Sequence, residues 1–309
     1  RPGVGRRGSL TKHHRQSMRA WIADREAEGD LVRVGESVDP VHEIAAYLIE
    51  QDGGSPLLFE AVARHEEPVT GNHLTTRARA AAALGVSVDD LQGKLIDAVR
   101  YPLAPFRVEQ APCQEVVIEN PDLKLLPIPT FFEHETGPYI SAGAIVARDT
   151  ATGRGNLSIA RLKPLGGNRA FIGIAPNHHL AVLARAAKER GERLEIAVTL
   201  GNHPAVMLAA CFYLGLGDDE MEVAGALLGE PLETVRCHGV DLAVPAHCEI
   251  VLEGVLDPDE TVEEGPVSEF HGMYERYGAG YVVTFSSMTR RSDAIFQCVL
   301  PGYGAEHIL

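Results

Sequence analysis

The sequence predicts an α+β fold, with a small N-terminal α/β domain at residues 18–112 and a strand-rich second domain at 113–300. Helical and strand periods alternate up to about Pro112, whereas short apolar or alternating segments separated by Gly, Pro and Asn dominate beyond it. A chain of 309 residues also exceeds one typical domain. So many strands with short turns favour a barrel-like or sandwich core over a strictly alternating parallel sheet.

Local signals predict each element of the N-terminal domain. An amphipathic pattern from Met18 ends at Gly29, and Asp39 before Pro40 is typical of an N-cap and a first helical residue. Ser87 and Asp90 have the spacing of a capping box. The expected helices are 18–29, 41–51, 75–85 and 89–99, and the expected strands are 31–34 and 55–62.

Residues 1–17 are basic and show no helical or strand period. They lack the apolar stretch of a secretory signal. We therefore expect 1–17 to be a vector-derived tag or disordered, with Met18 as the natural start.

The second domain is predicted to be mostly strands, interrupted by three helices. Its expected strands are 113–119, 140–149, 156–163, 169–175, 194–201, 235–245, 248–257, 281–291 and 294–300, and its expected helices are 179–191, 204–215 and 218–229.

Charge and cysteine content exclude several classes of protein. The net charge of −15 would repel nucleic acid and anionic lipid, so neither is an expected partner. The five cysteines form no CxxC pair, which fits neither a disulfide framework nor a thiolate zinc site. No apolar run is long enough to cross a membrane. A reducing cytoplasm is the expected location.

Four local patterns are candidates for chemistry, and each has a structural alternative. On an alternating strand, Asn156 and Ser158 would share one face and Arg161 the other, although a turn and a solvated edge explain them as well. His178 and His179 follow Pro176 at a helix start, where the dipole lowers a histidine pKa and favours metal binding; exposed capping is the alternative.

The other two patterns are acidic. Glu220 lies in the first turn of a helix, where it would complement the dipole or complete a metal site of oxygen and nitrogen ligands. Glu264 and Glu269 flank a Gly-Pro turn; two carboxylates brought together would raise one pKa, as a general acid requires, unless both are solvated. Phosphate-loop, GxSxG, HExxH and dinucleotide-binding motifs are absent.

Together, NLSIAR, PNHHL, the acidic helix before VRC and EGPVSEFHG resemble the UbiD family of decarboxylases, from about Met18 to the end of the chain. The resemblance implies a split β-barrel that binds prenylated FMN at 113–300. It also implies a divalent metal, Mn²⁺ or Mg²⁺, held by Asn156, His179 and Glu220, with K⁺ as a further expected ion. The cofactor-binding residues that it implies are Asn156, Ser158, Ile159, Ala160, Arg161, His178, His179 and Glu220.

Arg161, Glu264 and Glu269 correspond to the catalytic set of the family. The resemblance implies that Arg161 faces the substrate carboxylate or the flavin, that Glu269 donates and accepts the proton, and that Glu264 positions Arg161. The implied activity is reversible, non-oxidative decarboxylation of an α,β-unsaturated or (hetero)aromatic carboxylic acid.

The resemblance further implies a homodimer and a flavin prenyltransferase as cofactor supplier. Family members continue into a further domain, so 301–309 is expected to be the start of a missing C-terminal domain. Two other hypotheses stay open. One is a catalytically silent flavin-binding module, and the other is a metal-dependent hydrolase with the same ligands and a water in the open position.

Overall fold

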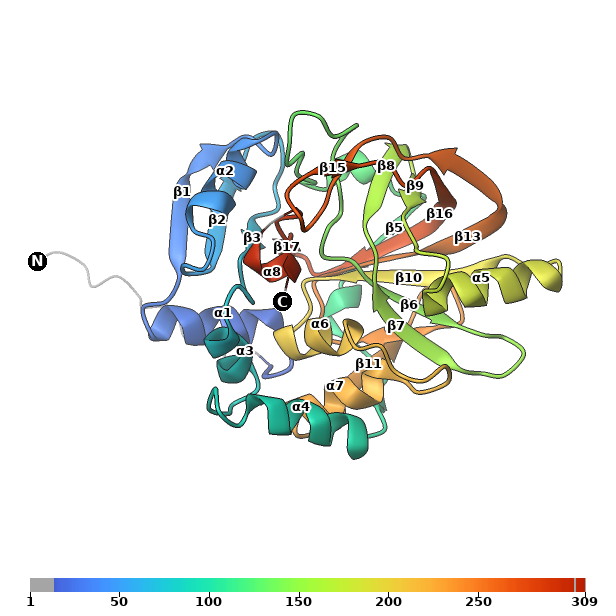
Figure 1. The fold of residues 1–309 in the computed structure, drawn as a ribbon, viewed down its shortest axis with the longest axis horizontal. Helices are drawn as coiled ribbons and strands as arrows, with labels where there is room; N and C mark the ends of the chain where they lie inside the picture. Colours follow the sequence, from blue (N-terminus) through green and yellow to red (C-terminus); the bar gives the residue numbers. More distant parts are fainter. Residues whose placement is uncertain (1–13, 303, 309) are drawn as a thin grey trace, which may run out of the picture.

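The computed structural model describes residues 14–302 and 304–308, and it confirms the predicted α+β fold. A small sheet with its helices lies at one end of the molecule, and a larger, strongly curved sheet lies at the other (Figure 1). The short helix α8 (Ala305–Ile308) lies between them, beside the small sheet.

The N-terminal sheet has the strand order β1-β2-β3-β17. Its last strand, β17 (Phe296–Gln297), comes from the end of the chain and pairs in parallel with β3. A segment that the sequence assigned to the second domain therefore completes the N-terminal sheet. The elements of this half are α1 (Met18–Ala27), β1 (Val32–Val38), α2 (Glu43–Glu50), β2 (Leu57–Val62), β3 (Val69–Gly71), α3 (Arg77–Ala83) and α4 (Leu91–Arg100).

Two expectations for this half need correction. Helix α2 has His42, at φ 71°, as its N-cap, while Asp39 accepts a hydrogen bond from the Val41 amide in a turn before the helix. Residues 14–17 also belong to the fold, because Ser17 caps α1 by accepting from the Ala20 amide at 3.1 Å, and the His14 ring stacks on His247. The rest of the predicted tag, 1–13, lies outside the described residues.

The large sheet forms the predicted split barrel. Its strand order is β7-β6-β10-β13-β16-β9-β8, and β5 pairs with β16. The two end strands, β7 (Gly155–Ile159) and β8 (Leu162–Gly166), are consecutive in the chain and joined only by Ala160 and Arg161. The sheet therefore curls until its two ends meet at a seam, which carries Arg161.

The remaining strands are β4 (Phe106–Val108), β5 (Val116–Glu119), β6 (Ala144–Arg148), β9 (Arg169–Ile172), β10 (Leu194–Leu200), β11 (Glu233–Arg236), β12 (Ala243–Pro245), β13 (Ile250–Glu263), β14 (Val267–Ser268), β15 (Tyr274–Glu275) and β16 (Ala279–Arg290). Strands β12, β11 and β4 form a small separate sheet, and β14 pairs with β15 in a hairpin. Short 3₁₀ turns occupy Pro112–Gln114 and Leu123–Leu125.

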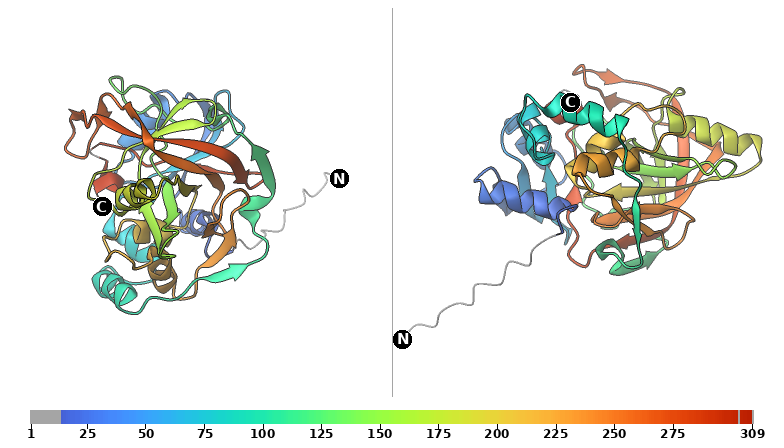
Figure 2. Two further views of the ribbon diagram at one scale, coloured as in Figure 1. Left: turned by 90° about the vertical axis from the view of Figure 1, so that its right-hand side faces the viewer. Right: turned by 90° about the horizontal axis from the view of Figure 1, so that it is seen from below.

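Helices cover the barrel on two sides. Helix α5 (His179–Glu189) lies along one side, and α6 (Pro204–Ala210) and α7 (Glu220–Leu228) lie on another, where α4 of the N-terminal half joins them (Figure 2). Lys94 of α4 donates to the Ala226 carbonyl at 2.9 Å. A helix of one half thus packs directly on the other.

The faces of the barrel strands alternate between two apolar cores. Ile145 of β6 lies in a core shared with the N-terminal sheet, whereas its neighbours Ala144 and Val146 lie in a second core beneath the helices. Among the described residues, no helix has the length and hydropathy of a membrane span.

Candidate active site

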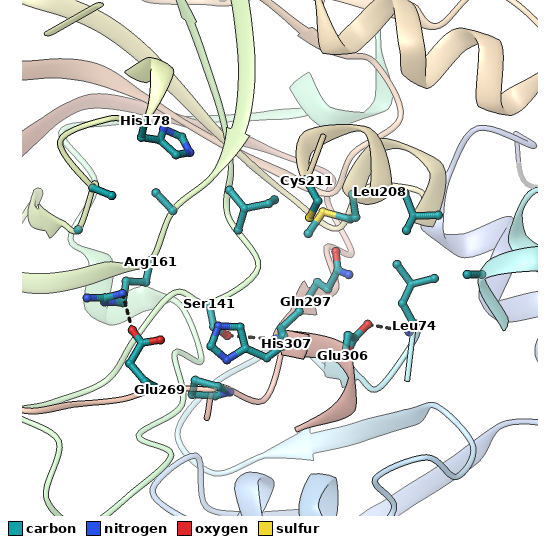
Figure 3. Close-up of a pocket in the computed structure, with 18 of the residues that line it drawn as sticks. Leu74, Ser141, Arg161, His178, Leu208, Cys211, Glu269, Gln297, Glu306 and His307 are labelled. Carbon is teal, nitrogen blue, oxygen red and sulfur yellow. Dashed lines mark hydrogen bonds and ion pairs between the residues drawn. The ribbon is translucent and has the colours of Figure 1, made fainter. Parts of the chain in front are cut away.

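A cavity of about 700 Å³ lies between the two halves of the molecule. Leu74 and Leu91 line it from the N-terminal half, Ile159 and Arg161 from the barrel, and Leu208 from α6. Figure 3 shows Arg161, Glu269 and His178 at one end, and Leu74 and Glu306 at the other. Apolar side chains make up most of its exposed wall, and polar ones such as Arg77, Gln92 and His307 also face it.

Arg161 lies between two carboxylates at one end of this cavity. Its Nε and Nη2 donate to the two oxygens of Glu264 at 2.6 and 2.8 Å, and its Nη1 donates to Glu269 Oε1 at 3.2 Å. Glu264 is 1% exposed, and both of its carboxylate oxygens accept from this one guanidinium. Burial is the largest single effect on the pKa of Arg161 and lowers it, but the hydrogen bond to Glu264 and the charges of Glu264 and Glu269 together outweigh burial and raise the pKa.

The seam explains why Arg161 is fixed in this place. The Arg161 carbonyl accepts from the Gly173 amide at 3.2 Å, and a Cβ on Gly173 would lie 3.3 Å from the guanidinium carbon. Glycine at 173 thus lets the guanidinium lie close to the backbone after β9. The Tyr277 ring covers the other side, with its centroid 5.2 Å from the same carbon.

The loop that carries the two carboxylates is held by buried polar groups. Gly265 has φ 86°, and a Cβ there would lie 2.5 Å from Thr136, so the turn after Glu264 requires glycine. Thr136 Oγ1 donates to the Glu264 carbonyl at 2.8 Å, and Lys163 also donates to this carbonyl. Burial lowers the pKa of Lys163.

A further carboxylate supports the same loop. Glu135 accepts from the Ser268 amide at 3.3 Å, next to Glu269, and burial raises the pKa of Glu135. Nothing in the sequence around Glu135 has a helical or strand period, which is why these supporting contacts were missed.

Asn156 and Glu220 come together at the other end of β7. Asn156 Nδ2 donates to Glu220 Oε2 at 3.4 Å, and the Leu157 amide donates to the same oxygen at 2.8 Å. Burial raises the pKa of Glu220, against the hydrogen bond from Leu157. Asn156 Oδ1 and Ser158 Oγ are buried without a partner in the described structure.

These groups fit a hard divalent cation. A buried carboxylate beside an unpaired amide oxygen is a costly arrangement for an apo protein and a favourable one for Mn²⁺ or Mg²⁺. Asn156 and Glu220 therefore have the donor atoms and the desolvation that a metal site needs.

The two histidines at the start of α5 have different surroundings. His178 caps the helix by accepting from the Leu180 amide at 3.4 Å, and it lines the cavity. Its pKa is lowered, as predicted, although burial is the main cause and the neighbouring His179 the second.

His179 is less closely tied to the predicted metal site. Its ring lies 5.2 Å from the Tyr213 ring, and within the described residues no hydrogen bond joins it to Asn156 or Glu220. The structure thus brings two of the three predicted metal ligands together and leaves His179 against Tyr213.

Ile159 and Ala160 line the cavity beside Arg161, as the predicted cofactor-binding segment requires. Other residues that line the cavity, Ser141 and Gln297 among them, could not be identified as site residues from the sequence. They come from segments that read as ordinary turns or strands, and only the tertiary fold places them here.

Two family models match the chain. The 3-octaprenyl-4-hydroxybenzoate carboxy-lyase N-terminal domain of UbiD matches residues 22–99, and the Rift-related domain of UbiD matches residues 106–304.

Two similar proteins are anhydromevalonate phosphate decarboxylases. The one from Methanothermobacter thermautotrophicus is 33% identical over 273 residues, which cover 86% of this chain and 62% of that protein. The one from Methanosarcina mazei is 34% identical over 292 residues, which cover 94% and 66%. The chain thus spans 62% and 66% of the length of these relatives.

Solved structures of a UbiD-class enzyme and of a vanillic acid decarboxylase have the same fold as this chain. An evolved dimeric form of the UbiD-class enzyme HmfF from Pelotomaculum thermopropionicum, in complex with prFMN, superposes with a TM-score of 0.92 at 41% identity, over 95% of this chain and 69% of that one. Vanillic acid decarboxylase of Sedimentibacter hydroxybenzoicus in its closed form gives a TM-score of 0.89 at 29% identity, over 95% and 66%.

Proposed function

The chain belongs to the UbiD family, and from that premise we propose that it is a reversible, non-oxidative decarboxylase of an α,β-unsaturated or (hetero)aromatic carboxylic acid. The observation that carries the proposal is the Arg161 guanidinium, which is hydrogen-bonded to Glu264 and Glu269 at one end of the cavity. This arrangement offers a cation for a carboxylate and an acid for proton transfer in one place.

We also propose that the cofactors are prenylated FMN and a divalent metal, Mn²⁺ or Mg²⁺, with K⁺ as a further ion. The HmfF structure contains prFMN, which supports the flavin. The unpaired Asn156 Oδ1 and Ser158 Oγ and the buried Glu220 support the metal and the polar end of the flavin. His178 and His179, at the start of α5, complete the proposed set. When bound, the modified flavin supplies the electron sink for cleavage of the carbon–carbon bond.

The roles of the protein residues follow from their contacts. Arg161 donates three N–H groups to the two glutamates, and its remaining N–H groups are free to orient the substrate carboxylate. Glu264 holds the guanidinium in place and is not one of the residues that line the cavity. Ile159 and Ala160 line the cavity beside Arg161 and reduce the water around it, which strengthens each charge interaction at this end.

Glu269 is the proposed proton carrier. Arg161 occupies its Oε1, and Figure 3 shows the second oxygen directed toward the cavity. As carbon dioxide leaves, the electron pair of the broken bond remains on the substrate carbon, and Glu269 donates a proton to that carbon. In the reverse direction, ionised Glu269 removes the same proton.

The substitution Glu269→Gln tests this role. After reconstitution with prenylated FMN and Mn²⁺, the wild type should release carbon dioxide from at least one acid of an acrylic, aromatic and heteroaromatic panel. It should also exchange deuterium into the product. The Glu269→Gln variant should bind flavin normally and lose both reactions, because the amide cannot carry the proton.

Glu263→Gln is the matched control, because Glu263 lies beside Glu264 in the chain but is exposed. It should leave turnover unchanged. A wild type with a flavin spectrum but no reaction on any acid would contradict the proposal and favour a silent flavin-binding module. Metal-dependent ester or amide cleavage without flavin absorbance would favour a hydrolase.

The assembly is part of the proposal. We propose a homodimer in the cytoplasm that receives its cofactor from a flavin prenyltransferase. The dimeric HmfF structure supports the first point, and five free thiols are consistent with a reducing compartment.

A further inference from the structure

Gln297 places a buried amide against the cavity, and the proposed function assigns this residue no role. The residue is 2% exposed, it lines the cavity, and its Oε1 has no hydrogen-bond partner in the described structure. Figure 3 shows the amide directed across the cavity toward Leu208 and Cys211, away from Arg161.

Strand pairing holds the backbone of Gln297 in place, so the unpaired amide does not belong to a mobile segment. Gln297 lies opposite Thr70 in the parallel pair of β17 with β3, and the next amide, of Cys298, donates to the Thr70 carbonyl at 2.9 Å. The strand therefore sets where the side chain starts.

The nearby side chains do not satisfy this amide. Leu208 and Val299 are aliphatic, and the one hydrogen bond of the Ser141 hydroxyl in the described structure is the one it accepts from the Val299 amide at 3.0 Å, so none of the three bonds Gln297 Oε1 there. A buried amide oxygen without a partner loses its hydration and gains nothing in return. Native proteins keep such groups mainly where something else completes the hydrogen bond, and the cavity is the open side.

We propose that Gln297 is a specificity-determining residue that hydrogen-bonds a hydroxyl or N–H group on the substrate, at the end remote from its carboxylate. The inference rests on the proposed function, because it takes the Arg161 end as the carboxylate site. An amide both accepts and donates, so a hydroxyl, which does the same, is the best match. The preferred substrates are thus hydroxylated or amino-substituted unsaturated or aromatic acids, and purely hydrocarbon acids bind less well.

The test compares matched acids with and without the polar group. Suitable pairs are 3- and 4-hydroxybenzoic acid against benzoic acid, and 4-hydroxycinnamic against cinnamic acid. Dissociation constants are measured by isothermal titration calorimetry on protein loaded with unmodified FMN, so that binding is read without turnover. The best hydroxylated acid should bind roughly 10- to 100-fold more tightly than its parent.

The Gln297→Met variant preserves the length of the side chain and removes its polar atoms. It should bring this ratio close to one by weakening only the hydroxylated acid. Gln297→His, which keeps one donor and one acceptor, should retain part of the preference. Gln114→Met is the control, because Gln114 bonds the Arg236 carbonyl and does not line the cavity.

Three results would overturn the inference. The first is a wild type that binds every pair equally, which needs no variant and so stands even if Gln297→Met fails to fold. The second is an unchanged ratio in folded Gln297→Met, and the third is a variant that loses flavin affinity while keeping its acid preference. By contrast, a clear preference in binding with no decarboxylation would count against the proposed function alone.

Discussion

Arg161 depends on the shape of its guanidinium as much as on its charge. It bonds Glu264 through two nitrogens and Glu269 through the third, a set that needs a planar fork. A lysine would offer one compact charge and could not hold both carboxylates in this arrangement.

On the proposed function, the substitution Arg161→Lys should therefore lower kcat/KM by a factor on the order of 100, because it removes the fixed geometry proposed for the substrate carboxylate and Glu269. It should also reduce the free energy of unfolding by about 2–3 kcal/mol, since Glu264 stays buried with a poorer partner. Steady-state kinetics and urea denaturation measure the two effects.

Arg154→Lys is the matched control at an exposed position, and it should behave as the wild type. Full activity in Arg161→Lys would contradict the role of the guanidinium fork.

The sequence predicted the charged residues of the site better than their surroundings. Arg161, Glu264 and Glu269 lie together as their motifs require, and Asn156 meets Glu220 across 64 positions of the chain. Lys163, Thr136 and Gln297 were not predicted, because their roles arise only when distant segments pack. The metal role of His179 stays a prediction.

At the level of elements, the long hairpin of β13 and β16 depends on close backbone contact. Gly254 lies at a register shift opposite Phe285, and a Cβ there would be 2.2 Å from the Thr284 carbonyl oxygen. No side chain can be accommodated without moving one strand away from the other.

Gly254→Ala should therefore destabilise the protein by about 3 kcal/mol or more, because a backbone atom cannot give way as a side chain does. Urea denaturation of the purified variant measures the loss.

Gly93→Ala is the matched control, and it should change the free energy of unfolding in the opposite direction. Gly93 lies inside α4 with open space around its Cα, so alanine should stabilise the protein by about 0.5–1 kcal/mol through helix propensity. Equal effects of the two substitutions would contradict the strand contact.

Most helices and strands were predictable, because their periods and caps are local. The start of α2 was not, since His42 takes a left-handed conformation where its amide bonds the Thr130 carbonyl of a distant loop. The contribution of β17 to the N-terminal sheet was also missed, because a two-residue pairing leaves almost no signal in the sequence.

For the whole molecule, buried histidines link stability to pH. Burial lowers the pKa of His73 to about 3 and that of His203 to about 4. Below about pH 6.5 these histidines are protonated in the unfolded chain but still neutral in the folded protein. The free energy of unfolding therefore decreases as the pH is lowered, until the folded histidines also become protonated. Glu306 acts in the opposite direction, because burial raises its pKa to about 7 and the folded state gains that proton first.

A variant isolates one of these contributions. His203 caps α6 by accepting from the Ala205 amide at 3.1 Å, and asparagine can make the same cap. Between about pH 6 and 4.5, His203→Asn should remove up to about 1.4 kcal/mol per pH unit from the slope of stability against pH. Urea denaturation at several pH values measures the slope.

His134→Asn is the control, since 66% of the His134 side chain is exposed, and its slope should match that of the wild type. Identical slopes for His203→Asn and the wild type would contradict the effect of burial.

The pairing of β3 with β17 also has a consequence for biosynthesis. More than two hundred residues separate the two strands, so at usual elongation rates β3 leaves the ribosome about 10 to 45 s before its neighbour exists. During that interval one edge of the first sheet is an open template for strands of other nascent chains. Chaperone demand should therefore be greatest in the interval between the synthesis of β3 and that of β17.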